Sequence, residues 1–178
     1  NRSNGVLVRN SFVGYIYRAA AGSNTTVQNC ILTDWVPASQ DGVLYDSNIF
    51  LKNADNPLNV SEQAVYTHNL FVGNGTLFEV TFDNGIVEDN TYTANSLAVA
   101  FPNAPVPADF VAYEFNKNYT VAPQFVGTNG PVGIYGGDAP WKDGSLPFVP
   151  HWTLLSAPAN TVNGVLPNVH IKASAQDN

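Results

Sequence analysis

His68 and Asp89 combine residue types and a spacing that suit acid–base chemistry. Each directly precedes an Asn in an internal repeat, so stacked coils would make the two side chains vertical neighbours. A His beside a carboxylate can take up and release a proton. Stacked opposite charges on a solvated face are also typical of a simple favourable pair, so both interpretations stay open.

Asp46 and Glu88 form a second pair of candidate catalytic residues. They share a column of the repeat but lie two coils apart, with Thr67 between them. At about 4.8 Å per coil the two carboxylates stand roughly 10 Å apart. That separation is too wide for one metal ion, although paired glycosidase carboxylates reach about that range. No cluster of Asp, Glu, His or Cys has metal-site spacing, so we expect neither a metal nor a cofactor.

Aromatic residues supply candidate ligand-binding positions. Tyr45 and Tyr66 occupy one column in adjacent coils, and Trp35 follows the second coil. An outward-facing Tyr column would form a platform for stacking sugars. An inward-facing column would be core, and Trp35 could be an exposed contact or part of a lateral loop.

The repeat that must position these residues is marked by regularly spaced Asn residues. The intervals between them are 19, 19, 21 and 21 residues: Asn10, Asn29, Asn48, Asn69 and Asn90. Two positions after each Asn comes a large apolar residue: Phe12, Ile31, Phe50, Phe71 or Tyr92. A period near 20 with short β-branched segments predicts a parallel β-solenoid. We expect the five Asn amides to stack as a structural ladder, with the apolar column filling the interior.

The composition limits the classes of partner. Charged residues make up only 12% of the 178-residue chain, and the net charge is −7. An acidic chain without clustered cations disfavours a nucleic-acid partner. No apolar run is long enough to span a membrane. The one cysteine, Cys30, lies within the repeat, which excludes a disulfide framework and indicates a small buried residue.

The repeat stops near residue 98, which divides the chain. We expect coils over residues 1–98 and, over residues 99–178, closing coils, an irregular loop-rich cap and a final strand, because Pro and Gly accumulate there. The chain opens inside a repeat without an N-terminal cap. We therefore expect the first coil to be covered by a missing N-terminal part of the chain or by an assembly partner.

The column pattern resembles right-handed parallel β-helix proteins of the pectate-lyase-like superfamily. The segment 121–126 followed by 132–137 is similar to the closing coil of secreted bacterial members, although Ala122 stands where an acidic residue is usual. The tail 169–175 resembles the terminal strand of such proteins from Bacteroidota. This resemblance implies a right-handed β-helix and an extracellular or cell-surface location. It leaves activity open, because this fold serves many functions.

We therefore expect a secreted or cell-surface β-helix module with a binding or structural role. The role would be related to carbohydrate, with polysaccharide as the possible partner, and the module would belong to a longer chain or assembly. The alternative is the C-terminal part of a polysaccharide lyase or glycoside hydrolase.

Overall fold

The computed structural model describes most of the chain in ten stretches: residues 5–14, 24–33, 42–60, 64–82, 86–87, 91–110, 117–128, 130–141, 151–156 and 170–174. The chain divides into two compact units, residues 1–146 and 147–178, and each is described by itself.

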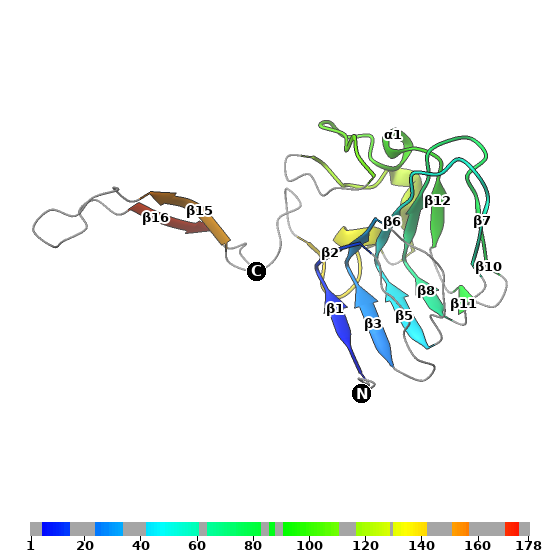
Figure 1. Cartoon of the computed structure of the whole chain (residues 1–178), viewed down its shortest axis with the longest axis horizontal. Coiled ribbons are helices and arrows are strands. Elements are labelled where there is room, and N and C mark those ends of the chain that lie inside the picture. The colour runs from blue at the N-terminus through cyan, green and yellow to red at the C-terminus, as the bar shows by residue number, and fades with distance from the viewer. Residues whose placement is uncertain are drawn as a thin grey trace, which may run out of the picture. The chain divides into compact units, whose positions relative to one another are not determined.

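Two five-stranded parallel sheets form the larger unit (Figure 1). Sheet A contains β1 (Leu7–Arg9), β3 (Thr25–Gln28), β5 (Val43–Asp46), β8 (Val65–Thr67) and β11 (Ile86–Val87). Sheet B contains β2 (Phe12–Val13), β4 (Ile31–Leu32), β6 (Ile49–Leu51), β9 (Leu70–Val72) and β12 (Tyr92–Ala94). Neighbouring strands of each sheet come from successive coils, which confirms the predicted all-β parallel solenoid.

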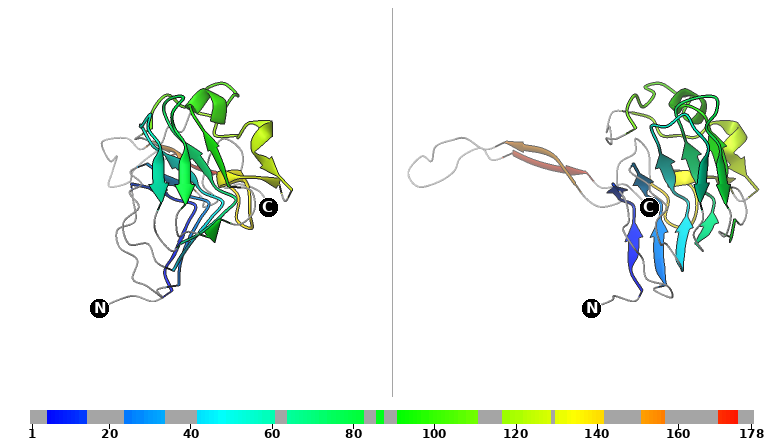
Figure 2. Two further views of the ribbon diagram at one scale, coloured as in Figure 1. Left: turned by 90° about the vertical axis from the view of Figure 1, so that its right-hand side faces the viewer. Right: turned by 45° about the vertical axis from the view of Figure 1, so that its right-hand side comes forward.

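A two-residue turn joins each of the first four sheet A strands to the following sheet B strand, and the two sheets meet at this corner (Figure 2). The first residue of the turn has a positive φ in these four coils: Asn10 (47°), Asn29 (49°), Ser47 (56°) and His68 (54°). Asn adopts this left-handed conformation more readily than most residues, which explains its use in the first two coils.

The predicted column of five Asn residues is wrong, because the structure divides it into two columns. Asn10 and Asn29 are the first residues of their turns, whereas Asn48 and Asn69 are the second. Paired strands of the second and third coils lie 18 residues apart, as in the pairing of residue 31 with residue 49. Asn29 and Asn48 are 19 apart and therefore fall out of register. Asn90 lies outside the described residues.

Packing of Phe50 explains the shorter coil. Phe50 pairs with Leu32 in one neighbouring coil and with Phe71 in the other, and the Phe50 and Phe71 rings stack with centroids 4.4 Å apart. Since side chains alternate along a strand, a one-residue slip would turn Phe50 out of the interior. The predicted apolar column is corrected in the same way, because Phe12, Ile31 and Tyr92 belong to the opposite face of sheet B, where Phe12 is exposed.

Sheet B therefore separates two apolar cores. The solenoid interior contains alternate residues of both sheets together with Cys30, Ala64 and Phe78 from the connections: Val27, Leu32, Val43, Tyr45, Phe50, Tyr66 and Phe71 are the strand residues. The second core lies on the outer face of sheet B, where Ile31, Ile49 and Leu70 pack against residues contributed from 94–141. A short third sheet, β7 (Leu58–Val60) paired with β10 (Val80–Phe82), adds to the interior.

The irregular segment expected as a C-terminal cap covers the outer face of sheet B. It contains the short helix α1 (Leu97–Ala100), the 3₁₀ turns η1 (Pro123–Phe125) and η2 (Gly133–Tyr135), and the antiparallel pair β13 (Val126–Gly127) and β14 (Gly130–Pro131). Buried side chains of this segment, among them Phe101, Tyr119 and Trp141, join the outer core.

The smaller unit contains one antiparallel hairpin. β15 (His151–Ser156) pairs with β16 (His170–Ser174), and the register shifts between Trp152 and Leu154. β16 falls within the final strand that the sequence predicts.

Candidate functional site

A column of hydrogen-bond donors follows the corner between sheets A and B. Each member directly precedes a sheet B strand in successive coils, and its side chain donates to a sheet A carbonyl one coil earlier. The pairs are Cys30 Sγ to Val8 (3.7 Å), Asn48 Nδ2 to Val27 (2.8 Å), Asn69 Nδ2 to Tyr45 (2.8 Å) and Thr91 Oγ1 to Tyr66 (3.3 Å). Since their partners are main-chain atoms, these residues stabilise the scaffold.

Two members of this column also bond to each other. Asn69 Oδ1 accepts from the main-chain N–H of Asn48 (2.9 Å) and from Asn48 Nδ2 (3.1 Å). Asn48 Oδ1 in turn accepts from the N–H of Cys30 (2.9 Å). All three residues are fully buried. The expected ladder of stacked amides therefore has one amide-to-amide bond in the described residues, between Asn48 and Asn69.

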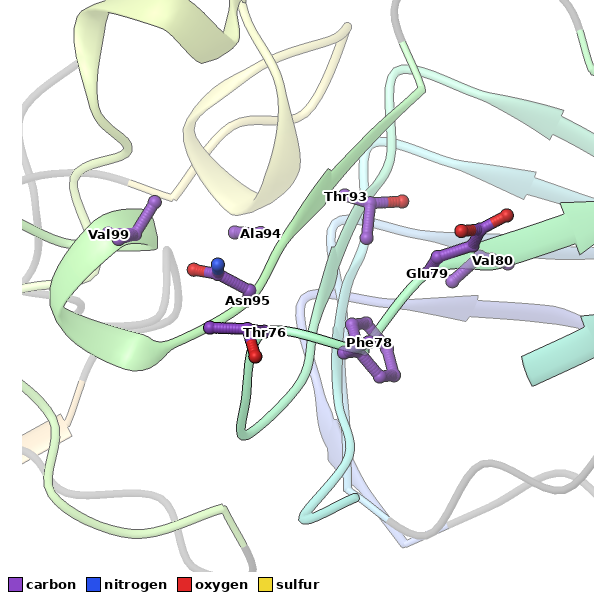
Figure 3. Close-up of a pocket in the computed structure, with 8 residues that line it drawn as sticks. All are labelled: Thr76, Phe78, Glu79, Val80, Thr93, Ala94, Asn95 and Val99. Atoms are coloured by element: carbon purple, nitrogen blue, oxygen red, sulfur yellow. The ribbon is translucent and has the colours of Figure 1, made fainter. Parts of the chain in front are cut away.

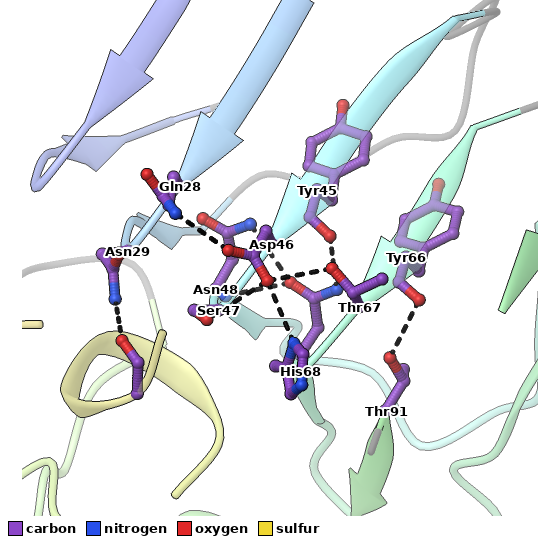
Figure 4. Close-up of polar contacts among 12 residues, drawn as sticks. Gln28, Asn29, Tyr45, Asp46, Ser47, Asn48, Tyr66, Thr67, His68 and Thr91 are labelled. Atoms are coloured by element: carbon purple, nitrogen blue, oxygen red, sulfur yellow. Dashed lines mark hydrogen bonds and ion pairs between the residues drawn. The ribbon is translucent and has the colours of Figure 1, made fainter. Parts of the chain in front are cut away.

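Asp46 collects polar contacts from three coils on sheet A (Figure 4). Its Oδ2 accepts from Gln28 Nε2 (2.9 Å), and its Oδ1 accepts from Thr67 Oγ1 (2.9 Å) and Ser47 Oγ (3.3 Å). His68 Nδ1 lies 3.1 Å from Asp46 Oδ1. The carboxylate is therefore held by neighbours on both sides.

The Asp46–His68 pair has the form of an acid–base dyad. In the neutral tautomer in which Nδ1 donates to this carboxylate, Nε2 would be a proton acceptor. His68 Nε2 is buried and has no hydrogen-bond partner. A proton acceptor oriented by a carboxylate could act as a general base, but a substrate must first reach the buried Nε2.

The sequence placed Asp46 and His68 in separate candidate pairs, and the structure brings them together. Asp46 pairs in register with Thr67, as the column predicts. Glu88 and Asp89, their expected partners, lie outside the described residues, as does Trp35. The positive φ of His68 explains why the alignment missed the contact, since the turn redirects its side chain toward the preceding coil.

Tyr45 and Tyr66 are core residues and form no exposed platform. They pair in register, and their rings stack with centroids 5.2 Å apart at an interplanar angle of 7°. Their exposed fractions are 1% and 0%. The column is the predicted one, but it faces the solenoid interior.

Residues 133–141 lie across the turns of several coils. Asn29 Nδ2 donates to the carbonyls of Gly136 (2.7 Å) and Ile134 (3.3 Å), and Asn10 Nδ2 donates to that of Ala139 (2.9 Å). The indole N–H of Trp141 donates to the Asn29 carbonyl (2.6 Å). The first-position Asn residues thus anchor this segment to the corner.

A pocket of about 510 Å³ opens beside β12, and none of the residues that line it belongs to the Asp46 cluster (Figure 3). Its lining comes from the connection between β9 and β10, from the start of β10, from β12 and the residue after it, and from α1: Thr76, Phe78, Glu79, Val80, Thr93, Ala94, Asn95 and Val99. Phe78 and Ala94 are buried and apolar, whereas Thr76, Glu79, Thr93 and Asn95 are exposed. The pocket therefore combines apolar contact with hydroxyl, amide and carboxylate groups.

Glycine at position 73 allows this pocket to form. Gly73 is buried, and a Cβ there would overlap the ring of Phe78. The adjacent turn is fixed by Asn74 Nδ2 donating to Asn53 Oδ1 (2.7 Å) and by the N–H of Gly75 donating to the Asn95 carbonyl (2.8 Å). Asn53 and Asn74 are 21 residues apart, as are the paired residues of β6 and β9, whereas Asn95 lies one residue out of register because β9 and β12 pair 22 residues apart.

Among the described residues, no three or more His, Cys, Asp or Glu side chains are grouped so as to hold a metal ion. Within the same residues, no helix is long and apolar enough to cross a membrane. Comparisons with protein-family profiles, curated proteins and solved structures found no match. The resemblance to pectate-lyase-like proteins therefore rests on sequence motifs alone.

Proposed function

We propose that this chain is a carbohydrate-binding module of a secreted or cell-surface β-solenoid protein, in which the pocket beside β12 binds the sugar. The pocket supports this proposal because its rim offers both donors and acceptors, through Thr76, Thr93 and Asn95. The exposed side chain of Val99 offers the apolar contact that a sugar's C–H face needs.

Binding without cleavage fits the charge of the lining. Hydrolysis of a glycosidic bond usually requires two carboxyl groups, one as acid and one as base or nucleophile. Among the eight lining residues, all within the described part of the chain, Glu79 provides one carboxylate. The lining thus has groups that can recognise a sugar, but it has one of the two carboxyl groups that hydrolysis usually requires.

A panel of neutral oligosaccharides titrated into the intact protein by calorimetry tests this proposal. We expect saturable binding that Asn95→Ala weakens. Gln124→Ala is the control, because Gln124 is exposed and does not line the pocket. Binding that both variants leave unchanged would place the sugar elsewhere, and no binding to any oligosaccharide would reject the function.

The alternative is a polysaccharide lyase or hydrolase, which the Asp46–His68 contact of 3.1 Å favours. In that case His68 would transfer the proton and Asp46 would orient it. Incubation of the intact protein with polysaccharides should then release unsaturated or reducing ends, and His68→Gln should abolish that release. Binding with no new ends would reject the enzyme.

The proposal includes a neighbour for the first coil. The inward residues Val8 and Val13 are only half-buried, whereas Val27 and Leu32, their counterparts in the next coil, are fully buried. Among the described strands, β1 is the edge of sheet A, and either a preceding part of the chain or an assembly partner would cover it. Light scattering of the intact protein tests the partner: a strictly monomeric mass would exclude self-assembly at this edge.

A further inference from the structure

We infer that Glu79 makes the pocket selective for glycans that carry a protonated amine over neutral glycans of the same backbone. This inference rests on the proposed function, because it names the chemical class of the sugar that the same pocket takes.

Glu79 is the charged member of the lining. The other seven lining residues, all described, are Thr, Phe, Val, Ala and Asn, so no cation among them neutralises the carboxylate. The Glu79 side chain is exposed, and its main-chain carbonyl is held by the N–H of Leu58 (2.8 Å). The backbone is thus fixed while the carboxylate stays available to a ligand.

The size of the pocket leaves room for a sugar ring beside this carboxylate. A volume of about 510 Å³ holds a few sugar rings at most. In Figure 3, Glu79 and Val99 stand at opposite ends of the lining, with Thr93 and Asn95 between them. A glycan that fills the pocket as far as Glu79 would bring an ammonium group on its ring close to the carboxylate, and opposite charges attract measurably even near water.

Glucosamine oligomers and N-acetylglucosamine oligomers of equal length provide matched probes, because they differ only in acetylation of the amine. We expect the wild-type protein, in mildly acidic buffer of low salt, to bind the glucosamine oligomer about threefold to tenfold more tightly. Glu79→Gln keeps the side-chain shape and should bring the two dissociation constants together. Added salt should narrow the wild-type difference, since the charges are partly exposed.

Asp138→Asn is the matched control, because Asp138 is an exposed carboxylate outside the lining. It should leave the preference intact. An equal loss in both variants would trace the preference to overall negative charge and overturn the inference.

Two further outcomes separate the inference from the function beneath it. Equal binding of both oligomers by the wild-type protein would overturn the selectivity and leave carbohydrate binding standing. Absence of binding by either oligomer and by the neutral panel would overturn carbohydrate binding itself, and the role of Glu79 with it.

Discussion

The side-chain amide of Asn48 donates to Oδ1 of Asn69 across 3.1 Å, between two coils of the solenoid. The same oxygen accepts from the main-chain N–H of Asn48, and Asn69 Nδ2 donates to the Tyr45 carbonyl. One buried amide thus bonds to polar groups of strand β5 and of the turn that follows it. Because Asn48 and Asn69 are both fully buried, water cannot replace Asn69 as the acceptor of the Asn48 N–H.

Replacing Asn69 with Leu tests this dependence. The change removes the acceptor of the buried Asn48 N–H and the donor to the Tyr45 carbonyl, while Asn48 Nδ2 keeps its bond to the Val27 carbonyl. We expect a loss of about 2–4 kcal/mol in unfolding free energy. Urea denaturation followed by circular dichroism measures the loss. Asn53→Ala is the control, since it removes an Asn–Asn contact that is exposed and should cost less than about 0.5 kcal/mol. Equal costs at the two positions would contradict the importance of burial.

Asn29 combines a left-handed backbone with an anchoring side chain, and two substitutions separate these roles. Asn29→Gly keeps the conformation but loses the bonds to residues 134 and 136, which should cost about 1–3 kcal/mol. Asn29→Ala adds the left-handed strain of about 1–2 kcal/mol, partly offset because Gly has a more flexible unfolded state. We therefore expect the Ala variant to be less stable than the Gly variant by roughly 0.5–1 kcal/mol.

Asn24 provides the matched control for this pair, because it has a φ of 50° and is exposed. Asn24→Ala and Asn24→Gly should differ by a similar amount, while neither shows the large loss that comes from the anchoring bonds. Chemical denaturation of the four variants measures both contributions. Identical stabilities for Asn29→Ala and Asn29→Gly would refute the strain at this turn.

The sequence predicted the architecture well because the repeat is a direct record of stacking. Period, short β-branched strands and the Tyr45–Tyr66 column all appear in the structure. The sequence did not predict the register of the strands. Asn29 lies one residue away from the position that is equivalent to Asn48. The packing of Phe50 in three dimensions decides which residues align. An alignment of the repeat on its Asn residues places every Asn at the same position of its coil, and the structure does not do so.

The candidate site was harder to predict. The Asp46–His68 contact requires a positive φ at His68, a conformation that a sequence column does not encode for His. The pocket depends on residues 76–80, 93–95 and 99, which three separate elements bring together. Gly73, whose missing side chain gives Phe78 its place, carries no sequence signal that distinguishes it from an ordinary turn glycine.

The Cys30 thiol should be unreactive in the folded protein. Burial raises the pKa of Cys30 from 9.0 to about 11, although hydrogen bonding with the main chain of Ser11 and Gln28 lowers it in part. Since the thiolate is the reactive form, labelling by a disulfide reagent at pH 8 should be far slower than in urea. Rapid labelling of the native protein would contradict this burial.

The same raised pKa makes stability depend on pH in a definite direction. The folded state holds the proton more tightly than the unfolded state, so this contribution is complete below pH 9 and falls as the pH rises toward about 11. Cys30→Ala should remove this part of the alkaline decline. Urea denaturation of both proteins at several pH values measures it, and parallel declines would show that other groups cause the loss.

Gly73 and Phe78 should be energetically coupled, because a Cβ at position 73 would occupy the space of the ring. Gly73→Ala forces Phe78 out of its buried position, and we expect a loss of about 2–4 kcal/mol together with weaker sugar binding. Phe78→Ala alone should cost about 3 kcal/mol through the cavity that it leaves.

In the double variant the methyl group introduced at position 73 meets no ring, so the cost should approach that of Phe78→Ala alone. Urea denaturation of the four proteins gives the coupling energy, which we expect to be about 2 kcal/mol. Simple addition of the two single losses would mean that the backbone, and not the ring, excludes a side chain at position 73.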